Sequence, residues 1–148
     1  MISTIRNVVL NIASKLNWLS PLVARIAVGV VFMQTGWAKL HNLPQIVEFF
    51  RKLGIPYPEL QAPFVSSVEL VCGILILVGL FTRLAAIPLI GTMVVAIITA
   101  KASQITGIAD LLGFVEFLYI AIFLWLFTAG PGPVSIDHFI CEKKDKES

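Results

Sequence analysis

Residues 60–81 read LQAPFVSSVELVCGILILVGLF, an apolar run that decides the fold class because it is long enough to cross a lipid bilayer. A helix of about 20 residues, rising about 1.5 Å per residue, spans the roughly 30 Å hydrocarbon core. Glu69 lies near the middle of this run. A charged side chain there costs roughly 2.5–3.5 kcal/mol on insertion scales. We therefore expect Glu69 to have a basic partner, a proton or a polar cavity.

The composition of the whole chain is typical of a protein embedded in a lipid bilayer. Of its 148 residues, 57% are hydrophobic and 14% are charged, and the mean hydropathy is +0.90. Soluble domains are about 25% charged. A net charge of +2, with no basic stripe, argues against nucleic acid as a partner. Polar residues interrupt the N-terminal apolar pattern, so no cleavable signal peptide is expected.

Four apolar runs predict an all-α membrane protein built as a four-transmembrane-helix bundle. The expected spans are 21–40, 60–81, 84–100 and 111–129. Apolar residues at helical spacing in 1–19 predict an amphipathic helix on the membrane surface. Pro44 to Gly54 predicts a short helix in the first loop. The chain thus divides into an interfacial helix at 1–19, a membrane domain at 20–140 and a charged tail at 141–148.

An even number of spans places both termini on the same side of the membrane. The segments on that side hold six basic residues, and the opposite segments hold four. The first group is Arg6, Lys15, Arg83, Lys143, Lys144 and Lys146, and the second is Lys39, Arg51, Lys52 and Lys101. Cytoplasmic segments carry the excess of Lys and Arg. The termini are therefore predicted to be cytoplasmic.

The ionisable residues of the spans fall into two layers. Arg25, Arg83 and Asp137 lie towards the terminal side and predict a structural charge cluster. The opposite layer holds two acids and two bases that can neutralise one another. Its members, together with two polar neighbours, are the predicted ligand-binding or proton-relay residues: Glu69, Glu116, Lys39, Lys101, Gln34 and Tyr119.

Helical spacing turns most of these residues to the bundle interior. Residues three and four apart share one helix face. The faces so defined are Arg25, Gly29, Phe32, Gly36 and Lys39; Ser66, Glu69, Gly73, Ile76 and Leu80; and Leu112, Glu116, Tyr119 and Phe123. Glycines on such a face allow a neighbouring helix to approach closely.

Two interpretations of the buried carboxylates stay open. They either form ion pairs that fix the register of the helices, or face a cavity and exchange protons with a ligand. Lys39 and Lys101 also fit a role as membrane anchors whose charged ends reach the interface.

No metal, haem or nucleotide cofactor is predicted. Cys72 lies within an apolar run and Cys141 in the polar tail, so they form neither a metal site nor a redox pair. His41 and His138 fall on opposite faces of the predicted membrane, which argues against a haem held between them. A glycine-rich phosphate loop is also absent.

The chain resembles the DoxX family of small membrane proteins. The resemblance covers about residues 20–140, and the order of its pieces makes it specific. The matching pieces are RIAVGVVFMQTGWAK from Arg25, Leu53–Pro58, Val68–Glu69–Leu70 with Gly73, LVGLFTR from Leu77, Gly130–Gly132 and Ser135–Asp137. It implies a four-helix bundle in a bacterial inner membrane. It also implies a redox setting, because the family is related to the membrane subunit of a thiosulfate:quinone oxidoreductase.

Three functions follow as hypotheses. The leading one is an integral subunit of a quinone-linked redox system, in which a soluble or membrane partner supplies electrons and quinone is the cofactor. The second is a small-molecule carrier or channel, for which Pro88 and Gly91 would form part of the path and a homo-oligomer is expected. The third is a non-catalytic scaffold that anchors a soluble redox enzyme through the tail and the loop helix. The residues supply no redox centre, so catalysis by the chain itself stays undecided.

Overall fold

The computed structural model describes residues 2–145, and within that range every regular element is a helix, which confirms the all-α fold class. The helices are α1 (Ile2–Lys15), α2 (Leu19–His41), α3 (Leu43–Lys52), α4 (Pro58–Val78), α5 (Thr82–Ala96), α6 (Ile108–Gly113), α7 (Val115–Ala129) and α8 (Ile136–Asp145). A π-helical turn, Ile97–Lys101, and a 3₁₀ turn, Ala102–Gln104, extend α5.

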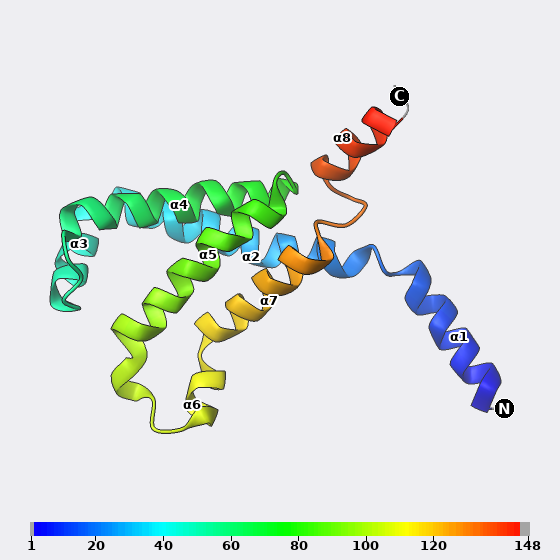
Figure 1. Ribbon diagram of the computed structural model, residues 1–148, viewed down its shortest axis with the longest axis horizontal. Helices are drawn as coiled ribbons and strands as arrows, with labels where there is room; N and C mark the ends of the chain where they lie inside the picture. Colours follow the sequence, from blue (N-terminus) through cyan, green and yellow to red (C-terminus); the bar gives the residue numbers. More distant parts are fainter. Residues whose placement is uncertain (1, 146–148) are drawn as a thin grey trace.

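The bundle consists of two helix pairs, α2 with α4 and α5 with α7 (Figure 1). Glycines set the close packing of the first pair. A Cβ atom added at Gly36 would lie 2.4 Å from the backbone nitrogen of Leu70, and one at Gly73 would lie 2.6 Å from that of Met33. Only hydrogen fits at these positions, so the backbones of α2 and α4 can touch. The predicted role of the small residues is confirmed for this pair.

The apolar core lies where the two pairs meet. Phe32 of α2 packs edge-to-face on Phe123 of α7, with ring centroids 5.0 Å apart. It makes a second edge-to-face contact with Tyr119 at 5.2 Å. Ile76 from α4 and Leu89 from α5 are fully buried in the same cluster. The phenylalanine on the predicted inner face of α2 therefore joins both pairs.

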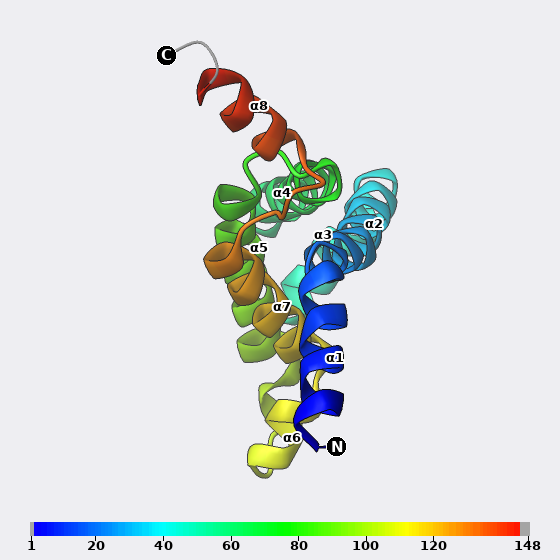
Figure 2. The same cartoon turned by 90° about the vertical axis from the view of Figure 1, so that its right-hand side faces the viewer.

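Figures 1 and 2 show that the α5–α7 pair is inclined to the α2–α4 pair, so the pairs diverge towards α3 and α6. Helices α1 and α8 leave from the opposite end of the bundle (Figure 1). The amphipathic N-terminal segment is a helix, as predicted. Of the predicted tail, 146–148 lie outside the described residues, and α8 continues through Asp145, so the tail begins inside a helix.

Within residues 2–145, three helices are long and apolar enough to cross a membrane, namely Leu19–His41, Pro58–Val78 and Thr82–Gln104. The predicted fourth span at 111–129 is not one continuous helix. Phe114 adopts an extended conformation with ψ of 138°, which separates α6 from α7. Helix α7 has 15 residues and is apolar, but at about 1.5 Å per residue it is shorter than the hydrocarbon core. Leu112, predicted to lie on the inner face, is instead 54% exposed, because the break separates it from α7.

Candidate functional site: a buried ion pair beside a cavity

Glu69 of α4 pairs with Lys39 of α2. The Lys39 Nζ lies 2.7 Å from both carboxylate oxygens and donates a hydrogen bond to each. The Glu69 side chain is 3% exposed and that of Lys39 is 33% exposed. Charge-assisted hydrogen bonds of this length are the strong ones. The isolated charge noted in the apolar run therefore has its partner on the neighbouring helix.

The close approach of α2 and α4 makes this pair geometrically possible. Gly36 packs against Leu70, the residue that follows Glu69. Lys39 lies three residues beyond Gly36, on the same face. Its long side chain therefore starts next to α4 and reaches back to the carboxylate. Glycine spacing and charge spacing in the sequence describe the same contact.

A cavity of about 600 Å³ lies between the two helix pairs, and the ion pair forms part of its wall. Glu116 and Tyr119 reach it from α7, and Pro88 and Gly91 from α5. Most of the remaining lining is apolar or aromatic, with Thr35, Gln61, Thr92 and Thr99 as additional polar side chains. Ligand sites in proteins are typically cavities of this size, lined by apolar groups with a few polar ones.

Helix α3 contributes Phe49 and Phe50 to the cavity wall, and Leu53, directly after the helix, adds to it. Sequence reasoning did not include this helix in the site. The signal was present, because Ile46, Phe49, Phe50 and Leu53 form an apolar side on an otherwise polar segment. Arg51 on the same helix binds Glu48 and Glu59, each at 2.6 Å. Arg51 donates hydrogen bonds to Glu59 and Glu48, which raise the pKa of its guanidinium, and the bond to Glu59 ties α3 to the start of α4.

The predicted mutual neutralisation of two acids and two bases is wrong for half of the set. Lys101 is not in the cavity wall; its Nζ lies over the Phe114 ring, 5.6 Å from the centroid. Glu116 forms no ion pair with any side chain that the structure describes. Gln34 is exposed and lies outside the cavity wall. Lys101 lies in the π-helical turn after α5, and its side chain packs on Phe114 instead of entering the cavity.

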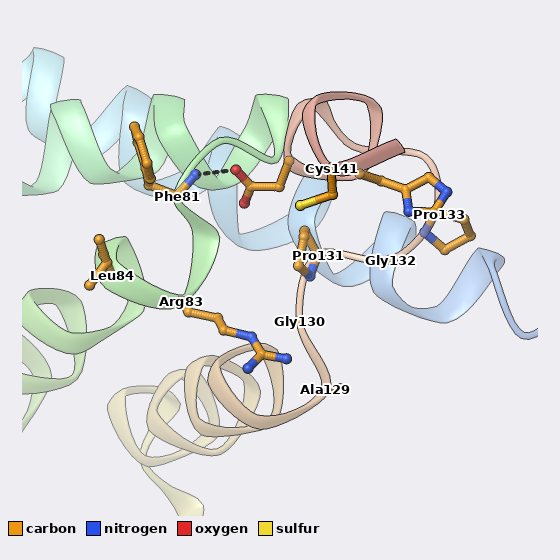
Figure 3. Close-up of a pocket in the computed structure, with 11 residues that line it drawn as sticks. Phe81, Arg83, Leu84, Ala129, Gly130, Pro131, Gly132, Pro133 and Cys141 are labelled. Carbon is orange, nitrogen blue, oxygen red and sulfur yellow. Dashed lines mark hydrogen bonds between the residues drawn. The ribbon is translucent and has the colours of Figure 1, made fainter. Parts of the chain in front are cut away.

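Arg25, Arg83 and Asp137 do gather at the other end of the bundle, but their hydrogen bonds go to backbone groups, and Asp137 attracts Arg25 without a direct ion pair between them. Arg25 is buried and donates to the Pro131 carbonyl at 2.7 Å. One Asp137 oxygen accepts from the N–H group of Phe81 at 2.9 Å (Figure 3). The other accepts from the N–H group of Thr82 at 3.2 Å. A carboxylate at this position caps the N-terminus of α5 and complements its dipole.

Arg83, at the start of α5, contacts the C-terminal end of α7, the other helix of that pair. Its guanidinium donates to the Thr128 carbonyl at 3.4 Å, in the last turn of α7. A cation is favourable at the C-terminal end of a helix. The predicted structural cluster thus joins α2, α5, α7 and the segment before α8 through helix ends, a kind of contact that residue types alone do not specify.

These features define a small helical membrane protein with an ion pair facing an internal cavity. The DoxX family model matches residues 20–102, which include both members of that pair. The chain belongs to the DoxX family, and this confirms the resemblance seen in the sequence.

Several proteins are similar to this chain over most of its length. The membrane protein Rv3486 of Mycobacterium tuberculosis (strain ATCC 25618 / H37Rv) is 34% identical over 84% of this chain and 83% of its own length. The inner membrane protein YphA of Escherichia coli (strain K12) is 36% identical over 78% of this chain and 86% of its own. CatD of Bacillus subtilis (strain 168), named provisionally as an oxidoreductase, is 28% identical over 83% of this chain and 88% of its own length. No solved structure matches the chain.

Proposed function

We propose that this chain is an integral subunit of a quinone-linked redox system in the bacterial inner membrane and that its cavity holds the quinone ring. The observation that carries the proposal is the Lys39–Glu69 pair in the wall of an otherwise apolar cavity. The provisional name of the relative CatD adds support for a redox setting. The names of Rv3486 and YphA support the membrane location.

The cavity suits the chemistry of a quinone. A quinone ring is flat and apolar and carries carbonyl oxygens that accept hydrogen bonds. Phe32, Phe50 and Phe64 supply aromatic surface in the wall. The Lys39 ammonium has three N–H donors, of which two bind Glu69. The third is available to a quinone carbonyl, and the Tyr119 hydroxyl offers a second donor from the opposite helix pair.

Reduction of a quinone to a quinol takes up two electrons and two protons. In this proposal a partner redox protein supplies both electrons, either from solution or within the membrane. Lys39 and Glu69 deliver one proton to a quinone oxygen, and Glu116 delivers the other. The basic residues of the terminal side support cytoplasmic termini, which would place the cavity towards the outer half of the membrane.

Photo-crosslinking with an azidoquinone in lipid nanodiscs tests the proposal. We expect labelled peptides from α2, α4, α5 and α7, competition by unlabelled quinone, and weaker labelling in Glu69→Gln and Glu116→Gln. Glu48→Gln is the matched control, because Glu48 is an exposed acid on α3 outside the cavity wall. Labelling that maps elsewhere, or that ignores both cavity carboxylates, would count against a quinone site.

A carrier is the second candidate, and the backbone of α5 favours it. Pro88 and Gly91 line the cavity, and the helix continues as a π-helical turn at Ile97–Lys101. Irregular backbone beside a cavity is a feature of membrane transporters. Solute flux into liposomes that depends on Glu69, with no quinone labelling, would favour this function over the redox subunit.

A further inference from the structure

A second hollow lies at the other end of the bundle, where α1 and α8 leave it (Figure 1). It has a volume of about 640 Å³ and is formed by the start of α5, the loop after α7 and one side of α8. Figure 3 shows Arg83 reaching from α5 towards the loop at Gly130, with Cys141 on the opposite side of the hollow. None of its lining residues belongs to the wall of the first cavity.

Arg83 brings unused hydrogen-bond donors to this hollow. A guanidinium has five N–H donors, and among the described residues the Arg83 group makes one hydrogen bond, the long one to Thr128. The residue is exposed, so the remaining donors are accessible. A guanidinium presents these donors in a planar fork that matches the oxygens of a phosphate group.

The acid in the hollow does not cancel this positive charge. Both oxygens of Asp137 already accept backbone N–H groups at the start of α5, where the helix dipole also compensates the carboxylate. Arg25 adds a second guanidinium behind the loop through its bond to Pro131. Asp137 also interacts electrostatically with Arg25, so the two guanidinium groups face a single carboxylate and the exposed Arg83 charge leaves the region suited to an anion.

The apolar walls point to a lipid. Phe81 is 58% exposed and Leu84 is 64% exposed beside Arg83. Pro131 and Pro133 form the opposite wall. A free anion gains nothing from contact with apolar surface. A phospholipid does, because its acyl chains begin within a few ångströms of its phosphate. The hollow also lies at a helix end, where a membrane protein meets the headgroup region.

We propose that this hollow binds an anionic phospholipid of the leaflet on the terminal side. Arg83 holds the phosphate, and Phe81 and Leu84 contact the start of the acyl chains. Basic sites of this kind at the cytoplasmic ends of membrane helices recognise anionic headgroups. The site is independent of the cavity at the Lys39–Glu69 pair and of the proposed function of that cavity.

Lipid titration of the full-length protein in neutral detergent, followed by native mass spectrometry, tests this site. The titrants are phosphatidylglycerol, phosphatidylcholine and inorganic phosphate. We expect phosphatidylglycerol to bind more tightly than phosphatidylcholine, and Arg83→Gln to weaken phosphatidylglycerol binding about fivefold, the effect of one basic residue at a membrane surface. Arg83→Lys should retain part of the preference.

Two further variants separate a specific site from general attraction or unfolding. Lys15→Gln removes an exposed cation on α1, outside the hollow, and should leave binding unchanged. Ala129→Leu narrows the hollow while keeping Arg83, and should weaken phosphatidylglycerol binding. Equal losses in Arg83→Gln and Lys15→Gln would overturn the proposal. Inorganic phosphate that displaces phosphatidylglycerol at equal concentration would also overturn it, because the ligand would then be the free anion.

Discussion

Replacing Lys39 by Met should destabilise the protein strongly, because it leaves the Glu69 carboxylate buried without a partner. With 2.7 Å between Nζ and the carboxylate oxygens, Coulomb's law gives an attraction of about 6 kcal/mol at an effective dielectric constant of 20. Desolvation of both groups opposes this attraction, and breaking a buried pair typically costs about 3–5 kcal/mol. Because the Lys39 side chain is 33% exposed, we expect Lys39→Met to lower the free energy of unfolding by about 3 kcal/mol, at the lower end of that range.

A double-mutant cycle measured by reversible unfolding in mixed micelles checks this value. Lys39→Met alone should show the full loss, whereas Lys39→Met combined with Glu69→Leu should recover most of it, since no charge is then left buried. Lys101→Met is the matched control. The Lys101 Nζ contacts only the Phe114 ring among described partners, so this variant should lower the free energy of unfolding by at most about 1 kcal/mol. A coupling energy near zero between positions 39 and 69 would refute the reasoning.

Three other predictions follow from single contacts. Gly36→Ala should cost about 1–3 kcal/mol in the same unfolding assay, because its Cβ would meet the backbone of α4, whereas Gly91→Ala on α5, with nothing within 4 Å, should be neutral or stabilising. Asp137→Ala should lower the free energy of unfolding by about 1 kcal/mol through loss of the α5 cap; a free energy of unfolding equal to that of the native chain would contradict it. The hydrogen bond from the Thr106 hydroxyl lowers the pKa of the Asp110 carboxyl group in the folded protein. The ionised Asp110 therefore contributes its full stabilisation above the unfolded pKa of about 3.9, and this stabilisation is lost as the pH falls through the lower folded pKa. The protection of backbone amides at the start of α6 against hydrogen exchange, corrected for the intrinsic pH dependence of the exchange rate, should therefore fall at low pH in the native protein. A protection profile in Asp110→Asn with the same pH dependence as that of the native chain would oppose this.

The apolar runs predicted most of the helices because a bilayer admits few structures. Every backbone polar group in hydrocarbon must be paired within its own segment, so a long apolar run is read as a helix. The inner face of α2 was also predicted, since three- and four-residue spacing defines a side of a helix without reference to its neighbours. Arg25, Gly29, Phe32 and Gly36 are buried as expected.

The fourth apolar run was predicted with the wrong boundaries for a physical reason. Composition measures hydrophobicity but not backbone direction, and the extended residue Phe114 interrupts a stretch that is apolar on both sides. The capping interactions of Asp110 with Thr106 and Gly107 start a separate short helix before it. The grouping of Glu116 with Lys101 failed because Lys101 lies in a π-helical turn, where the spacing of a regular α-helix no longer sets the direction of a side chain.

The sequence by itself determined that the chain is helical and suited to a membrane, that it belongs with the DoxX proteins, and that Glu69 needs a partner. The first and last of these conclusions depend on local hydrophobicity and on spacing within one helix, and the family depends on the resemblance of short motifs in a fixed order. Only the tertiary structure decided that the partner is Lys39, that α3 contributes to the wall of a cavity beside the pair, and that Asp137 caps α5 across 55 residues of sequence or more. Such contacts depend on the distance and inclination between helices, which spacing within a helix does not encode.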